Sequence, residues 1–251
     1  MNLAELLTIP AGICPDTEIL RVQDDALTYT QLQARVAGAA AALTELGVGS
    51  GDVVALLDTN GTAAITALYA CAALGAIFVP LNFRARTQEL AHMLGSTAPK
   101  LVLAGSRYVQ QAQEALGPRG TARILDVTSL LTDDSVDEDG WLEPVETEDD
   151  TLAALLFTSG TTAAAKAVML AHANLVDYVL TVSELATGEE RGSILIAAPL
   201  HHIAGLAAIL SSTWAGRRMV LMSQFDPGEW LRLAAHERIT HAFLVLSLIH
   251  I

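Results

Sequence analysis

The chain has little cysteine, little positive charge and little charge of any kind. Cys14 and Cys71 are its two cysteines, too few for a disulfide framework or for a zinc site built from cysteine alone. We therefore expect a protein of a reducing compartment. Fourteen lysines and arginines stand against 28 aspartates and glutamates, a formal net charge of -14. This is the wrong sign for binding a phosphate backbone, so we expect no nucleic-acid partner.

Charged residues make up 17% of the 251 residues and hydrophobic residues 52%. A disordered chain is excluded, because disordered chains are poor in hydrophobic residues and rich in charge. A chain of this length buries a large core, either as one large domain or as two small ones.

Neither a secretion signal nor a membrane segment is predicted. The first residues include Glu5 and no basic stretch, unlike a secretory signal, so we expect a cytoplasmic protein. Residues 59–83 carry no charge and are long enough to cross a bilayer. Alanine, glycine and threonine dominate this run, however, and Gly75 and Pro80 interrupt it. It therefore predicts a buried helix over residues 63–74 and a buried strand over residues 76–81.

Strand and helix patterns alternate along the chain. Strands are predicted over residues 27–30, 53–57, 76–81, 100–104, 151–157, 193–198, 219–222 and 242–246. Helices are predicted over residues 32–46, 63–74, 87–94, 174–186 and 227–236, with another beginning near residue 205. This order predicts an α/β fold with mostly parallel sheets and helices on both faces.

Ten aspartates and glutamates fall between residues 133 and 150. We interpret residues 131–150 as a solvated acidic connection between a first block, residues 1–130, and a second block, residues 151–251. The carboxylates have no calcium-loop spacing. His236 and His241 are five residues apart, whereas a zinc helix needs a spacing of four. We therefore predict no metal-ligating residues in this chain.

The most informative segment is residues 155–170, LLFTSGTTAAAKAVML, in which an apolar strand runs into small and hydroxyl residues. Backbone N–H groups and hydroxyls in such a loop suit a polyphosphate, and a lysine adds positive charge. These candidate residues are Thr158, Ser159, Gly160, Thr161, Thr162 and Lys166. A Walker A loop is excluded, because Ala165 and Ala167 flank the lysine. From these residues alone, an ordinary Ser/Thr-rich loop between a strand and a helix is the alternative.

A family resemblance decides between these interpretations. TSGTTAAAKAVML followed by AHANL resembles the phosphate-binding signature of the AMP-forming adenylate-forming enzymes, which include the acyl-CoA synthetases. APLHHIAGL resembles the second core motif of that family, and LTYTQLQARV, LGVGSGDVVALL and ACAALGAIFVPLNFRARTQELAHML resemble its amino-terminal part in the same order. The resemblance covers residues 27–245. It implies the amino-terminal part of the large adenylation domain, with stacked, mostly parallel sheets.

The resemblance implies a ligase that activates a carboxylic acid with ATP and Mg²⁺ and passes the acyl group to coenzyme A. AAAKA together with QFDPGEW resembles the fatty-acid type. By the same resemblance, Thr158, Ser159, Gly160, Thr161, Thr162 and Lys166 cover the β and γ phosphates. His202 lies near the reacting carboxylate and the α-phosphate, and Gly205 gives the backbone clearance. His201 is assigned to packing or to the wall of the acyl pocket. Without the motif, His202 has the alternative of a core histidine bonded to a carbonyl.

The sequence departs from the family pattern in two places. Ala163, Ala165 and Ala167 stand where the family has Gly, Pro and Gly, and from this we predict that Ala165→Pro is tolerated. The adenine-binding, magnesium-binding, ribose-binding and hinge motifs and the carboxy-terminal domain are absent from residues 1–251. We therefore expect an incomplete ligase that completes neither half-reaction alone. The alternatives are an adenylating enzyme that loads a carrier-protein thiol and a noncatalytic module that binds a nucleotide or an acyl group.

Overall fold

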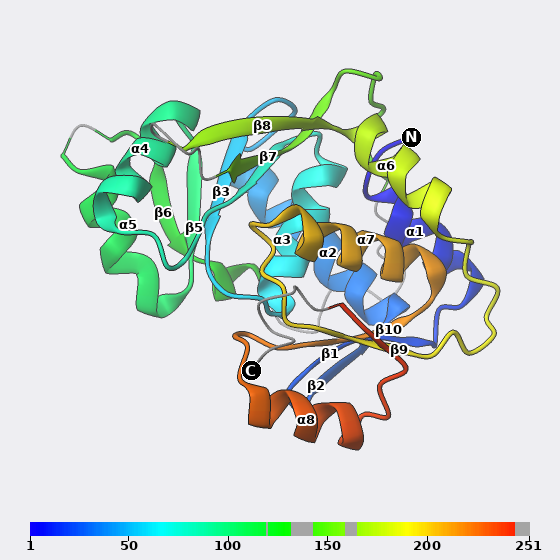
Figure 1. The fold of residues 1–251 in the computed structure, drawn as a ribbon. Helices are drawn as coiled ribbons and strands as arrows, with labels where there is room; N and C mark the ends of the chain where they lie inside the picture. Colours follow the sequence, from blue (N-terminus) through cyan, green and yellow to red (C-terminus); the bar gives the residue numbers. More distant parts are fainter. Residues whose placement is uncertain (119, 132–142, 159–164, 244–251) are drawn as a thin grey trace.

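The computed structural model describes residues 1–118, 120–131, 143–158 and 165–243, and two sheets dominate them (Figure 1). The first sheet has six strands in the order β6-β5-β3-β4-β7-β8. All neighbours in it are parallel except β7 and β8, which are antiparallel. Its strands are β3 (Val53–Leu57), β4 (Ile77–Pro80), β5 (Leu101–Ala104), β6 (Arg123–Asp126), β7 (Leu152–Thr158) and β8 (Lys166–Ala171).

The second sheet has five strands in the order β11-β9-β10-β1-β2. Only β1 and β2 are antiparallel. Its strands are β1 (Glu18–Val22), β2 (Asp25–Thr28), β9 (Ser193–Ile196), β10 (Arg218–Leu221) and β11 (His241–Ala242). Each sheet thus draws strands from both sides of residues 131–150.

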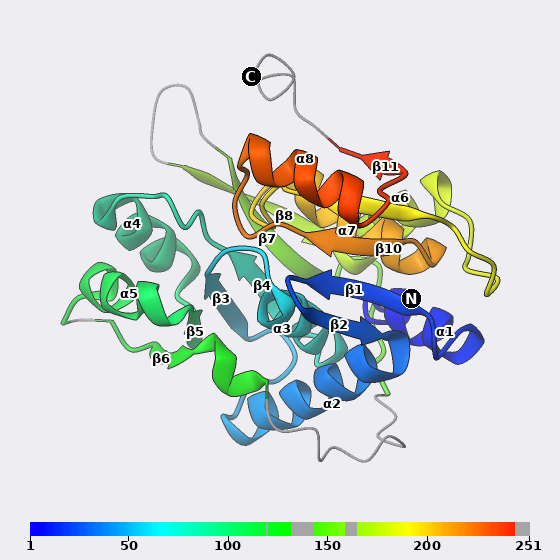
Figure 2. The same ribbon diagram turned by 90° about the horizontal axis from the view of Figure 1, so that it is seen from below.

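Helices fill the space between the sheets and cover their outer faces (Figures 1 and 2). Those between the sheets are α1 (Glu5–Ile13), α2 (Tyr29–Glu45), α3 (Thr62–Ala73) and α7 (Ile203–Ala215), and α6 (His172–Val182) packs on α7. The outer face of the first sheet carries α4 (Thr87–Thr97) and α5 (Val109–Leu116), and that of the second carries α8 (Pro227–His236). The short 3-10 helices η1 (Ser106–Tyr108) and η2 (Val127–Leu130) follow β5 and β6.

Successive side chains of the strands alternate between the layers. In β3, Leu56 packs in the central core with α2 and α3, whereas Leu57 packs on the other face with α4 and α5. In β9, Ile196 faces the central core and Leu195 faces α8. Side chains on a strand point to opposite faces with a period of two, so a strand buried on both faces reads as a continuous apolar run. The sequences of β3 (VVALL) and β9 (SILI) are therefore apolar apart from Ser193.

Local signals at the helix ends agree with the fold. The Thr28 hydroxyl accepts a hydrogen bond from the backbone N–H of Gln31, and the Gln31 side chain accepts one from the backbone of Thr28, a capping box that starts α2. The Asp226 carboxylate accepts from the Glu229 backbone N–H at the start of α8. Gly216 ends α7 at φ 70°, a left-handed conformation that favours glycine.

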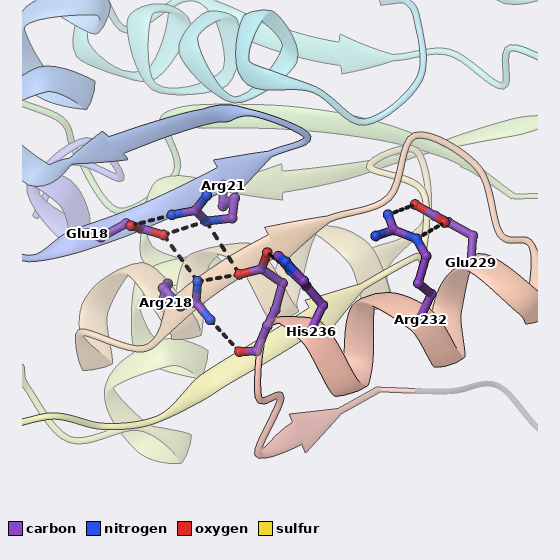
Figure 3. Close-up of polar contacts among 7 residues, drawn as sticks. Glu18, Arg21, Arg218, Glu229, Arg232 and His236 are labelled. Carbon is purple, nitrogen blue, oxygen red and sulfur yellow. Dashed lines mark hydrogen bonds and ion pairs between the residues drawn. The ribbon is translucent and has the colours of Figure 1, made fainter.

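An ion-pair cluster fastens α8 to the second sheet (Figure 3). The Arg218 guanidinium on β10 lies 3.2 Å from the Glu18 carboxylate on β1 and 2.7 Å from the Glu237 carboxylate, just after α8. Arg218 also donates to the backbone carbonyl of Glu237. Arg21 pairs with Glu18 at 2.8 Å. Glu237 is the most buried carboxylate of the cluster, with 10% of its side chain exposed. Burial raises its pKa, but the hydrogen bonds with Arg218 and His236 and the charges of Arg21 and Arg218 together hold the pKa below the usual range.

The α/β fold with mostly parallel sheets and helices on both faces is confirmed. The uncharged run forms the fully buried α3 and the strand β4. In the described ranges, no helix is long and apolar enough to cross a membrane. The helix predicted over residues 174–186 begins and ends earlier, and α1, β1, α5, β6 and β8 were not predicted. Of the strand predicted over residues 242–246, residues 244–246 lie outside the described residues, as do residues 132–142 of the acidic connection.

Candidate active site

A cavity of about 820 Å³ lies where the carboxyl ends of strands from both sheets meet. Most of its lining side chains are apolar, and several are aromatic. The residues that line it are Phe83, Arg84, Leu156, Phe157, Thr158, Val168, Leu170, Ala197, Ala198, Pro199, His201, His202, Ile203, Ala204, Ser223, Gln224, Phe225 and Phe243. Ligands of α/β proteins bind at the carboxyl ends of parallel strands, and this volume suits a small-molecule site.

Thr158 and Lys166 are brought together by a hairpin. They are cross-strand partners at the end of the pair where β7 finishes and β8 begins, and both are exposed. Thr158 lines the cavity, whereas Lys166 is not among the lining residues. The predicted loop residues Ser159, Gly160, Thr161 and Thr162 lie outside the described residues. The expectation of a loop between a strand and a helix is wrong, because a strand, β8, begins at Lys166 and α6 begins only at His172.

His202 lies at the amino-terminal end of α7, where it is the N-cap residue. Its backbone carbonyl accepts hydrogen bonds from the N–H groups of Gly205 and Leu206, and its own N–H donates to the Pro199 carbonyl at 3.0 Å. The side chain is exposed and lines the same cavity as Thr158. The alternative of a core histidine is therefore wrong, because the imidazole is not buried.

His201 forms part of the cavity wall and is buried, with 8% of its surface exposed. Its ring meets the Phe83 ring edge-on with centroids 5.6 Å apart, and it lies 4.3 Å from the His202 ring. Burial, and then the nearby His202 and Arg84, lower the pKa of His201 to about 4. His201 is thus neutral at physiological pH. The charged guanidinium of Arg84 also lines the cavity.

Gly205 gives the clearance that the motif predicts. A Cβ atom at Gly205 would lie 2.3 Å from the Pro199 carbonyl oxygen and 2.7 Å from that of Ala198. Since real Cβ atoms do not approach an oxygen so closely, any larger residue would push residues 198–199 away from α7. Glycine here lets residues 198–200, which we call the cavity loop, pack directly on the first turn of α7.

Three other residues around the cavity were not predicted as site residues. Phe83 and Arg84 follow β4, with the Arg84 guanidinium 5.4 Å from the Phe83 ring centroid. Asn60, after β3, bonds to the cavity loop from behind. The position of all three at the carboxyl ends of adjacent strands is the signal that finds them, and it requires the strand order.

Comparisons with known proteins identify the family of this chain. The family model described as "AMP-binding enzyme" matches residues 11–251. This chain belongs to the AMP-binding enzyme family. The resemblance seen in the motifs is thereby confirmed.

In the described part of this AMP-binding chain, no group of three or more His, Cys, Asp or Glu side chains is placed to hold a metal ion.

The relatives of this AMP-binding chain are acyl-CoA ligases. It is 37% identical over 237 residues to a feruloyl-CoA synthase of Amycolatopsis, covering 93% of this chain and 46% of that enzyme. It is 30% identical over 224 residues to the long-chain-fatty-acid–CoA ligase FadD13 of Mycobacterium tuberculosis, covering 86% of this chain and 44% of that enzyme. The chain thus spans about half the length of the curated relatives it matches.

Solved structures resemble it over nearly its whole length. The N-terminal domain of FACL13 from Mycobacterium tuberculosis, solved with an inhibitor, superimposes with a TM-score of 0.88 and 27% identity, covering 99% of this chain and 64% of that one. ATP-bound MatB from Rhodopseudomonas palustris gives a TM-score of 0.80 and 26% identity, covering 94% of this chain and 48% of that one.

Proposed function

We propose that this chain forms the amino-terminal part of an AMP-forming ligase that activates an apolar carboxylic acid with ATP and transfers the acyl group to coenzyme A. In the first step the carboxylate oxygen attacks the α-phosphorus of ATP, and pyrophosphate leaves. In the second the thiol sulfur attacks the acyl carbon of the adenylate, and AMP leaves. The observation that carries the proposal is that Thr158 and His202, from the two separate motifs, line one cavity.

The chain's own residues have distinct tasks in this proposal. Thr158, Ser159, Gly160, Thr161, Thr162 and Lys166 hold the β and γ phosphates, through hydroxyls, backbone N–H groups and one ammonium group. The hairpin places the lysine at the same end of the strands as Thr158. His202 lies beside the reacting carboxylate and the α-phosphate. Positioning and charge neutralisation are most of what transfer at phosphorus requires of a protein.

Mg²⁺ has no ligand set in the described part of the cavity. None of the lining side chains is a carboxylate. We therefore propose that the ion enters with the phosphates of ATP, and no step here depends on a protein ligand for it.

We propose the class of the carboxylic acid from the side chains that line the cavity. Phe157, Phe225 and Phe243, together with leucine, valine and alanine side chains, give an apolar wall that suits an apolar acyl group. We propose a fatty acid as the substrate, and ferulate is the comparison compound, because the chain is 37% identical to a feruloyl-CoA synthase and 30% identical to a long-chain ligase. Decanoate that binds more tightly than ferulate in calorimetry supports the fatty acid, and the reverse order overturns it.

The test of ATP binding is isothermal calorimetry of this chain with Mg-ATP. The chain has two lysines, Lys100 and Lys166, which allows a matched pair of variants. Lys166→Ala is expected to weaken binding about 10- to 100-fold, the value of one hydrogen bond to a charged group. Lys100 bonds to Asp52 and Gly47, so Lys100→Ala is expected to bind normally. Equal affinities of the two variants would overturn the role of Lys166.

A further inference from the structure

The buried side chain of Asn60 forms hydrogen bonds with the backbone of the cavity loop, residues 198–200. Asn60 is 4% exposed. Its Nδ2 donates to the Ala198 carbonyl at 2.9 Å, and its Oδ1 accepts from the Leu200 backbone N–H at 3.1 Å. Asn60 is not itself a lining residue of the cavity. It therefore acts on the cavity only through the backbone of residues 198–200.

Only a carboxamide of this length satisfies both partners. One backbone group is an acceptor and the other a donor, so the side chain must present a donor and an acceptor side by side. Aspartate lacks the donor, and serine is too short to reach both groups. Without Asn60, a buried carbonyl and a buried N–H would lose their partners, which costs more than the bonds themselves contribute.

The turn that carries Asn60 is itself fixed by the neighbouring strand. The Arg107 guanidinium, after β5, donates to the Thr59 hydroxyl at 3.0 Å. The Asp58 carboxylate accepts from the Thr59 backbone N–H and lies so close to Gly105 that a Cβ atom there would be 2.4 Å from Oδ1. Asn60 thus extends from a rigid part of the first sheet to a loop of the second.

The opposite side of the loop is fixed by α7. Gly205 packs against the carbonyl groups of Ala198 and Pro199. Residues 198–200 are therefore gripped between Asn60 and the first turn of α7, and the next two residues are His201 and His202. Any release of the loop moves both imidazoles.

We propose that Asn60 is a positioning residue, which clamps residues 198–200 and so sets His201 and His202 in the cavity. The importance of these histidines for ligands rests on the function proposed above, whereas the clamp itself is independent of it. His201 reports on the clamp, because its neutral state depends on burial beside Phe83, His202 and Arg84. A loosened loop admits water to the ring, which stabilises the charged form.

The experiment is an NMR pH titration of the His201 ring between pH 7.5 and 5, with its signal assigned by its loss in His201→Asn. In the unmodified chain we expect no titration in this range. In Asn60→Ala we expect a midpoint above 5, closer to the ordinary value of about 6.5. If Asn60→Ala does not fold, Asn60→Ser replaces it, because its hydroxyl leaves a hydrogen-bonding group in the buried position.

Asn2→Ala is the matched control. Asn2 is also buried, and its carboxamide donates to the carbonyl groups of Ala72 and Val145 and accepts from the Ala4 N–H. We expect this control to lower the melting temperature and to leave the His201 titration unchanged. An unchanged His201 titration in the folded Asn60 variant would overturn the clamp. Failure of the chain to bind Mg-ATP would contradict the proposed function and leave the titration result standing.

Discussion

The Gly205 Cα lies against the Pro199 carbonyl, so that a methyl group on Gly205 would be 2.3 Å from the Pro199 oxygen. This contact joins the first turn of α7 to the cavity loop. We predict that Gly205→Ala lowers the free energy of unfolding by about 1–3 kcal/mol, because the loop must move to admit the methyl group. Urea denaturation measures the change.

The control for this prediction is Gly12→Ala near the end of α1. Gly12 has no neighbouring atom within 4 Å of an added Cβ. Alanine there is expected to be neutral or to stabilise by up to about 0.5 kcal/mol, because it loses less backbone entropy than glycine. Equal effects of the two substitutions would contradict the close approach at Pro199.

We predict that acid destabilises the protein between pH 6.5 and 4 through two buried histidines. The pKa values of His172 and His201 are both lowered to about 4, mainly by burial. In this window the unfolded chain binds protons that the folded chain excludes, so stability falls as the pH falls. For each histidine, about 3 kcal/mol of the free energy of unfolding is fully present above pH 6.5 and is lost by about pH 4. Chemical denaturation at a series of pH values measures the slope.

His172→Asn separates the contribution of His172. The His172 Nδ1 accepts a hydrogen bond from the Leu3 backbone N–H at 2.9 Å, and the side-chain oxygen of asparagine replaces that acceptor without a titrating ring. We expect the slope between pH 6.5 and 4 to decrease in this variant. A slope that stays unchanged would mean that His172 titrates normally in the folded protein.

We predict that Arg218→Lys destabilises the second sheet by about 1 kcal/mol. Lysine cannot contact Glu18, Glu237 and the Glu237 carbonyl together, because it lacks the planar guanidinium. The matched control is Arg232→Lys, which alters an exposed pair with Glu229 within α8 (Figure 3). Exposed pairs contribute little, so we expect hardly any change in its urea midpoint. A larger decrease in stability for Arg232→Lys than for Arg218→Lys would contradict this prediction.

Ala165→Pro is predicted to be tolerated. Ala165 stands immediately before β8, and its carbonyl accepts from the His92 Nε2 at 3.1 Å. Proline keeps that carbonyl. We expect the melting temperature to stay within a few degrees of that of the unmodified chain in calorimetry. A large decrease would show that the backbone at residue 165 has a conformation that proline cannot adopt.

Buried periodic segments were predictable from the sequence, and long-range partners were not. The α3 helix and the strands β3 and β9 followed from apolar runs that end at turn residues. The short α1 contains Pro10 and Gly12, which hide its period. Strand β1 is recognisable only once Leu20 is paired with Met219, about two hundred residues away.

The same reasoning applies to the candidate site. Thr158, Lys166 and His202 were found because they belong to motifs, which are local in sequence. Asn60 belongs to no pattern of that kind, since its partners Ala198 and Leu200 are distant in the chain. Its role depends on the order of strands and on the approach of two sheets, which no window of sequence contains.

The pairing of β1 with β10 also sets the order in which the two sheets can form during synthesis. The six described strands of the first sheet have all been made once residue 171 has been added. The hairpin of β1 and β2, though made first, has no parallel neighbour until β10 ends at residue 221. One edge of the amino-terminal hairpin therefore has no strand partner while residues 29–217 are synthesised, and β10 then pairs with it.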